Sequence, residues 1–205
     1  GDTSPFLKSL FGDKRTLLVK VGQSIQTTMG MSFYEQTCKI LGEQVGYKVE
    51  LQKKVLGFIP ENVKQYLHML NEIKYVPNRE KEFEDLVRLS KENKIKSQNE
   101  YPDSTVDVYI TTDEGREILI DITTVKPNKK EFRIMKEKIL RWAAYRLSQN
   151  PDLDIETYFA IPYNPEGKTN TDINYNRWND YYDRSDVLVG DELWKKVSND
   201  NCSID

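Results

Sequence analysis

The chain has 205 residues, of which 38% are hydrophobic and 31% charged, and its formal net charge is −3. This length suits one ordinary domain that can bury a core without disulfides, and an aromatic content of 11% is too high for a disordered chain. No run reaches the roughly 18 uncharged apolar residues of a membrane span. Residues 1–5 show no signal-peptide pattern, so we expect a cytoplasmic protein with no membrane partner.

Several site types are excluded by what the sequence lacks. The two cysteines, Cys38 and Cys202, are too far apart in sequence to indicate a disulfide framework or a zinc site. The single histidine, His68, lies in an amphipathic helical pattern, which makes histidine-based catalysis improbable. There is no Gly-x-Gly-x-x-Gly stretch, and Pro162 stands where a P-loop ending at Gly167 would need glycine. We therefore predict no nucleotide cofactor.

Apolar periodicity and turn residues predict the secondary structure in chain order. Helices are expected at 16–28, 32–44, 62–74, 81–92, 130–148 and 191–197, and strands at 47–52, 106–110, 117–125, 157–161 and 187–189. Ser32 and Glu35 have the spacing of a capping box at the start of the second helix. A strand hairpin followed by helix, strand, strand and helix predicts an α/β (α+β) fold, with a central mixed β-sheet flanked by helices.

The hairpin at 106–125 determines whether two aspartates meet. Asp113-Glu114-Gly115 suits a three-residue loop in which the glycine is left-handed. That register places Asp107 directly opposite Asp121, with Cβ atoms roughly 5 Å apart. Two carboxylates at this separation can share one Mg²⁺ ion. A two-residue loop would instead put the aspartates on opposite faces of the hairpin.

The two faces of this hairpin differ in polarity. One face is apolar and is expected to be core; it carries Val106, Val108, Ile110, Ile118, Ile120 and Ile122. The other face carries both aspartates with Tyr109, Leu119 and Thr123. Two carboxylates on a partly apolar face repel each other and lose solvation, which a divalent cation would offset. The alternative is that this face is solvated and the aspartates are simply exposed.

The helix expected at 130–148 is basic around an apolar stripe. The stripe comprises Phe132, Met135, Ile139, Leu140, Trp142, Ala143 and Leu147. Lys136 lies inside it, which indicates a partner or a task, unless its ammonium reaches solvent along its own stem. Seven basic residues fall within 16 positions: Lys126, Lys129, Lys130, Arg133, Lys136, Lys138 and Arg141. This patch suits a phosphodiester substrate, although a plain amphipathic surface has the same pattern.

Two acids fourteen positions apart on a hairpin before a helix resemble the core of PD-(D/E)xK nucleases. More narrowly, the chain resembles type II restriction endonucleases of the TdeIII kind. The segments that carry this resemblance are PFL at 5–7, TMGMSFYE at 28–35, TVKPN at 124–128, AIPYNP at 160–165 and VLVGDELW at 187–194. The resemblance implies magnesium-dependent hydrolysis of duplex DNA at a short specific site by a homodimer. It also implies one nuclease domain over 1–205, with a helical part at 1–100, the catalytic hairpin and helix at 101–150, and C-terminal strands with a recognition region at 151–205.

The resemblance also assigns roles at the hairpin. Asp107, Asp121 and the backbone carbonyl of Ile122 would hold Mg²⁺. The family pattern expects lysine two residues after the second acid, and Thr123 stands there. Lys126 and Lys136 are the candidate replacements, and Lys126 comes first because Pro127 and Asn128 can end the strand before it. Otherwise Thr123 marks a loss of activity.

Other residues are candidates for supporting roles. Glu35 would add a carboxylate to the metal site, unless it serves only as the capping-box partner of Ser32. Lys129, Lys130 and Arg133 are expected to contact phosphates. A polar stretch after residue 163 would reach base edges, because asparagine suits adenine and arginine suits guanine; its members are Asn164, Asn170, Asn174, Asn176 and Arg177. The alternatives are a junction or repair nuclease, a catalytically impaired DNA-binding protein, and a plain interaction domain.

Overall fold

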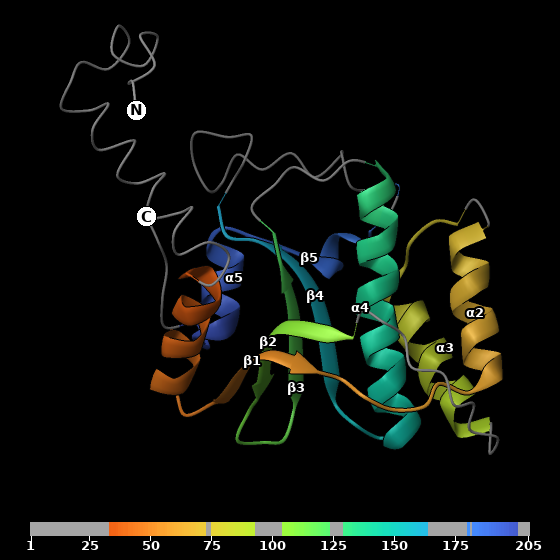
Figure 1. Cartoon of the computed structure of the whole chain (residues 1–205), viewed down its shortest axis with the longest axis horizontal. Helices are drawn as coiled ribbons and strands as arrows, with labels where there is room; N and C mark the ends of the chain where they lie inside the picture. The colour runs from red at the N-terminus through yellow and green to blue at the C-terminus, as the bar shows by residue number, and fades with distance from the viewer. Residues whose placement is uncertain are drawn as a thin grey trace, which may run out of the picture.

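Five strands form one mixed sheet whose strand order follows the chain (Figure 1). The computed structural model describes residues 33–72, 75–92, 104–123, 129–163, 180 and 182–200. The strands are β1 (Lys48–Lys54), β2 (Thr105–Thr111), β3 (Glu117–Ile122), β4 (Ile155–Ile161) and β5 (Val187–Val189). Neighbours are antiparallel from β1 to β3 and parallel from β3 to β5. The predicted mixed sheet is confirmed.

Helices cover both faces of this sheet. Besides a helix at residues 33–44, they are α2 (Glu61–Glu72), α3 (Arg79–Glu92), α4 (Lys129–Gln149) and α5 (Asp191–Val197). In Figure 1, α4 lies on one face together with α2 and α3, and α5 lies beside the helix at 33–44 on the other. This arrangement confirms the α/β prediction. The helix expected at 16–28 lies outside the described residues. Among the helices that are described, none is long and apolar enough to cross a membrane.

The hairpin between β2 and β3 has the predicted register. The N–H of Thr112 donates to the carbonyl of Arg116 at 2.9 Å, and Gly115 adopts a φ of 83°, which is the left-handed value that favours glycine. Val108 pairs with Ile120. The next position along the two strands therefore brings Asp107 and Asp121 to the same end of the hairpin.

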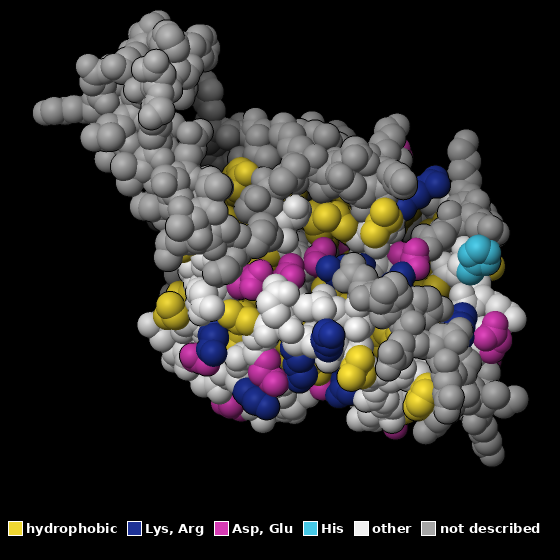
Figure 2. Space-filling view, in the orientation of Figure 1, with side chains coloured by type: hydrophobic (Ala, Val, Ile, Leu, Met, Phe, Trp, Pro, Cys, Tyr) yellow, Lys and Arg dark blue, Asp and Glu magenta, His cyan; other side chains and the backbone are white. Residues whose placement is uncertain are grey.

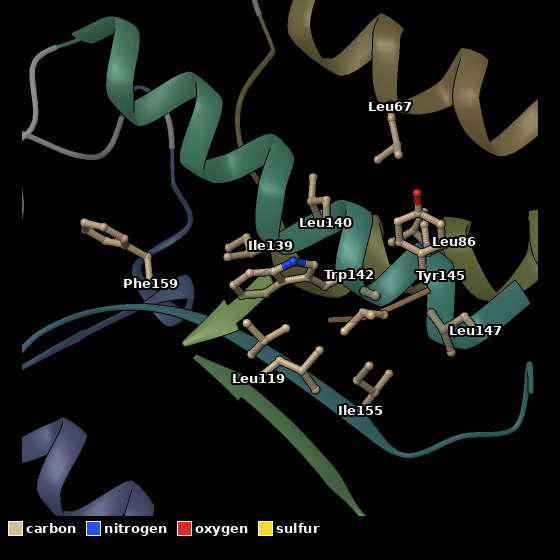
Figure 3. Packing of buried hydrophobic residues seen from close by; sticks show 14 of the residues in the cluster. Leu67, Leu86, Leu119, Ile139, Leu140, Trp142, Tyr145, Leu147, Ile155 and Phe159 are labelled. Atoms are coloured by element: carbon tan, nitrogen blue, oxygen red, sulfur yellow. The ribbon is translucent and has the colours of Figure 1, made fainter. Parts of the chain in front are cut away.

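Two apolar clusters separate the sheet from its helices. The predicted stripe of α4 is confirmed: Phe132, Ile139, Leu140, Trp142, Ala143 and Leu147 are buried, and Met135 is partly buried beside them. This stripe packs on Leu119 and Ile155 of the sheet, while Leu67 and Leu86 reach α4 from α2 and α3 (Figure 3). The opposite face holds Val108, Ile110, Ile118, Ile120 and Ile122 against Cys38, Leu193 and Trp194.

Strands β1 and β2 reverse their side-chain alternation at one facing position. Val106 packs in the α4 cluster, whereas Val108 packs in the opposite cluster, so the expectation that they share a face is wrong. Directly after β1, Val55 likewise packs on the α4 side, whereas Val49 of β1 packs on the other. The cause is local, because Gln52 adopts a φ of 50°, a left-handed conformation that turns an extended strand. Asp107 of β2 lies at this reversal.

Candidate active site

Four elements meet around the carboxylate of Asp107. Its Oδ2 accepts a hydrogen bond from the N–H of Ile122 in β3 at 2.8 Å, and its Oδ1 accepts one from Nε2 of Gln52 in β1 at 3.1 Å. The same Nε2 donates to Oε1 of Glu35 at 3.0 Å. Glu35 belongs to the helix at 33–44 and is 6% exposed. The structure thus brings Asp107 and Glu35 together through one amide group.

The backbone of Ile122 faces the same side as Asp107. In an extended strand, the N–H and C=O of one residue point to the same edge. The N–H of Ile122 is bound by Asp107, and the N–H of the next residue, Thr123, donates in the other direction to Ala160 of β4 at 2.9 Å. The carbonyl of Ile122 is therefore oriented toward the side of β3 where Asp107 lies.

Asp121 is buried under α4. It is 5% exposed, and its Oδ1 lies 2.7 Å from Nζ of Lys138. Lys138 also lies over the ring of Trp142, with Nζ 5.2 Å from the ring centroid. The second acid of the hairpin is therefore held by an ion pair from α4, whereas the first is held by hydrogen bonds from β1 and β3.

The electrostatics of Glu35 reflect its burial and the nearby charge of Asp107. Burial raises the pKa of Glu35, and the charge of Asp107 raises it further, while the hydrogen bond from Gln52 acts in the opposite direction. Figure 2 shows acidic side chains gathered in a row across the middle of one face, next to lysine and arginine side chains. Carboxylates that are held close together in partly buried surroundings are stabilised by a bound cation.

The donor types at the hairpin end suit a hard cation such as Mg²⁺. Within the described ranges, no group of three His, Cys, Asp or Glu side chains could hold a metal ion. Magnesium does not need such a group, because it is commonly bound by one or two carboxylates and keeps several waters. Asp107, Asp121 and the carbonyl of Ile122 are all oxygen donors, which a hard cation prefers.

Lys136 lies in a different cluster. It is 8% exposed, and its Nζ lies 2.5 Å from both Glu82 of α3 and Asp186, which belongs to a 3-10 turn (Arg184–Asp186). Arg79 binds the same Asp186 at 2.8 Å. The prediction that this lysine has a partner is confirmed. Its partners, however, are the carboxylates of a buried ion network rather than Asp121.

Lys138, not Lys136, is the lysine that the structure brings to the hairpin. In the sequence, Lys138 stands out only as one member of the basic patch. A signal was present, because Lys138 precedes Trp142 by four residues and so borders the apolar stripe that faces the sheet. Gln52 had no comparable signal, since nothing in the pattern of β1 indicates its left-handed backbone.

The remaining predicted residues are described only in part. Arg133 is exposed on α4, and Thr123 is half-buried directly after β3. Of Lys129 and Lys130 only the helical backbone is described. The others lie outside the described residues: Lys126, Asn164, Asn170, Asn174, Asn176 and Arg177.

The chain is similar to known type II restriction enzymes. A family model described as "Type II restriction endonuclease, HinfI" matches residues 2–202. The type II restriction enzyme MjaII of Methanocaldococcus jannaschii is 28% identical over 188 residues, which is 85% of this chain and 48% of MjaII. HgiCII of Herpetosiphon aurantiacus, also a type II restriction enzyme, is 29% identical over 92 residues, 44% of this chain and 33% of HgiCII. The chain thus spans about half the length of MjaII and a third of HgiCII. No solved structure matches the chain.

Proposed function

Because the chain belongs to the HinfI family of type II restriction endonucleases, we propose that it hydrolyses phosphodiester bonds of double-stranded DNA at a short specific site. Its matched relatives MjaII and HgiCII are type II restriction enzymes. The observation that supports the proposal at residue level is the β2–β3 register, in which Asp107 and Asp121 each lie one position beyond the pair Val108–Ile120. This arrangement suits the PD-(D/E)xK core.

Mg²⁺ is the cofactor of this proposal. Asp107, Asp121 and the carbonyl of Ile122 would hold it. When bound, Mg²⁺ lowers the pKa of a water and stabilises negative charge that develops on a phosphate. The protein fixes the two carboxylates beforehand, Asp107 by hydrogen bonds from Ile122 and Gln52 and Asp121 by its ion pair with Lys138. Ligands held in this way lose little freedom when the ion binds.

Glu35 has a supporting role in the proposal. Its hydrogen bond to Gln52 links it to Asp107, so it can orient that carboxylate or contribute to a second ion. Burial raises its pKa, which makes it a better proton acceptor than an exposed glutamate. Its capping-box partner, Ser32, lies outside the described residues.

The DNA contacts of the proposal come from the basic helix and the polar stretch. Lys129, Lys130 and Arg133 in the first turns of α4 would bind phosphates, which carry most of the non-specific affinity. Asn164, Asn170, Asn174, Asn176 and Arg177 would read base edges. A short palindromic site would be bound by a homodimer, whose symmetry matches that of the site. We place this activity in the cytoplasm.

Digestion of a phage genome tests the function. With Mg²⁺ we expect discrete fragments, and with a chelator none. Asp107→Asn and Asp121→Asn should each cut at least about 10²-fold more slowly, because each removes a charged oxygen ligand. Asp152→Asn is the matched control, since Asp152 is an exposed carboxylate paired with Lys91; it should cut at the wild-type rate.

The outcomes separate the rival functions. A smear without discrete fragments would contradict site specificity, and full activity of Asp107→Asn would contradict the metal site. Thr123, at the position where the family pattern has lysine, favours a second candidate, a DNA-binding protein without cleavage activity. That candidate predicts salt-sensitive binding of duplex DNA and intact DNA in Mg²⁺. Cutting of branched DNA alone would indicate a junction nuclease.

A further inference from the structure

We propose that Lys138 of α4 is the catalytic lysine of this chain, acting beside Asp121 in place of the lysine that Thr123 replaces. The inference rests on the proposed function. It is carried by one contact, the 2.7 Å distance between Nζ of Lys138 and Oδ1 of Asp121, which joins residues 17 positions apart. The two side chains are only 16% and 7% exposed.

This ion pair differs from an ordinary surface pair in its position. Exposed pairs contribute little and shift easily, because both side chains stay mobile in water. Lys138 instead comes directly before Ile139 and four residues before Trp142, which are both completely buried, on a helix of 21 residues packed on the sheet. Its ammonium lies over the ring of Trp142 as well as beside Asp121. A partly buried side chain on a packed helix therefore holds one ammonium group beside Asp121.

Two of the other candidates, Lys136 and Thr123, are less well placed. The ammonium of Lys136 is bound by two fully buried carboxylates, which leaves it committed to its own network. Successive helical residues are rotated by about 100°, so Lys136 and Lys138 point in directions about 160° apart around the helix axis. Thr123 stands at the motif position but has no charge to offer. Lys138 alone of these three combines a positive charge with contact to Asp121.

In the proposed hydrolysis, Lys138 acts only as a positively charged hydrogen-bond donor. In the hydrolysis, a bond forms between a water oxygen and phosphorus, and the bond from phosphorus to the leaving sugar oxygen breaks. One proton of the water is lost and the leaving oxygen gains one, so no oxidant or further reactant is needed. An ammonium has three donors, so Lys138 can keep Asp121 while donating to the attacking water or to a phosphate oxygen. It stays protonated and offsets charge in the transition state.

The pair predicts two effects of opposite direction. When Lys138 is replaced by methionine, Asp121 loses a positively charged neighbour that repels an incoming cation. Lys138→Met should therefore bind Ca²⁺ in the absence of DNA at least as tightly as the wild type, with an increase of up to about tenfold. The same variant should cleave at least about 10²-fold more slowly in Mg²⁺, because the charge at the phosphate is lost. A purely structural lysine would not give this combination.

Lys196→Met is the matched control. Lys196 is also a partly buried lysine that pairs with a carboxylate, Glu156, and lies 5.1 Å from the centroid of a ring, that of Tyr158. It removes the same kinds of contact on the other side of the sheet. Cleavage is measured in single turnover with saturating enzyme, so that weaker DNA binding does not lower the rate. Ca²⁺ binding is measured by calorimetry and folding by circular dichroism. Lys196→Met should cleave at the wild-type rate.

Each result decides between defined alternatives. If Lys138→Met cleaves at the wild-type rate while Asp121→Asn does not, the assignment of Lys138 is wrong and the proposed function stands. If Lys138→Met loses Ca²⁺ binding together with cleavage, Lys138 only supports the fold of the site and the proposal is overturned. If the wild type leaves duplex DNA intact in Mg²⁺, the proposal and the function both fail. Should Lys138→Met not fold, Lys138→Gln, which keeps a donor without the charge, decides by the same criteria.

Discussion

Replacing Lys136 by methionine should cost the fold about 3–5 kcal/mol at pH 7, because it breaks a buried ion pair from one side. The ammonium lies 2.5 Å from Glu82 and from Asp186, and neither carboxylate side chain is exposed. Asp186 would keep Arg79 at 2.8 Å. The uncompensated charge is therefore that of Glu82, whose pKa is already raised by burial although Lys136 lowers it. Methionine preserves most of the packing of the lysine stem.

Thermal unfolding followed by circular dichroism measures this cost. At roughly 2–4 °C per kcal/mol for a chain of this size, Tm should fall by roughly 6–20 °C. Folding takes up a proton at Glu82 when its pKa is raised, so the deficit of the variant should shrink from pH 7 to pH 5. The double variant Lys136→Met with Glu82→Gln removes the buried charge and should recover most of the loss. An unchanged Tm at pH 7, or a deficit that grows at pH 5, would refute this reasoning.

Substitutions at three further positions, Gln52, Glu35 and Gly42, test the backbone and one carboxylate. Gln52→Gly should have a higher Tm than Gln52→Ala, although glycine usually destabilises a strand relative to alanine. The reason is that a φ of 50° costs a residue with a Cβ roughly 1 kcal/mol. Glu35→Gln keeps an acceptor for Gln52 and removes a carboxylate whose pKa is raised by burial and by Asp107. In urea unfolding, the free energy of unfolding of Glu35→Gln should exceed that of the wild type at pH 7, and this gain should vanish below pH 4.5. A gain that persists in acid would contradict the charge argument. Gly42→Ala would place its Cβ 2.7 Å from Cγ2 of Val49, so we expect a loss of about 1–3 kcal/mol, and equal stability would mean that the helix shifts freely.

Much of the fold is predictable from the sequence because it follows local rules. The loop with Gly115 sets the hairpin register, and the spacing of apolar residues such as Phe132 and Trp142 sets the buried side of α4. The strand at 187–189 and the helix at 191–197 have the predicted bounds. The family match confirms the resemblance to type II restriction endonucleases, and the narrower TdeIII resemblance stays a prediction.

The rest of the site depends on contacts between distant parts of the chain. Which lysine reaches Asp121 is decided by how α4 lies on the sheet. Helical periodicity shows that Lys136 and Lys138 point in different directions, but not which of them faces Asp121. The reversal at Gln52 and Asp107 could not be predicted either, since an alternating pattern indicates a regular strand. Such departures from local preference concentrate where a protein positions functional groups.

The buried network has a consequence for synthesis of the protein. Asp186 follows α4 by 37 positions, measured from Gln149, yet it is a partner of both Lys136 and Arg79. A nascent chain that has emerged only as far as α4 would have to bury two cations with Glu82 as their nearest carboxylate. The native contacts between α3 and α4 therefore form only after the ribosome has synthesised Asp186, which directly precedes β5, the last strand of the sheet.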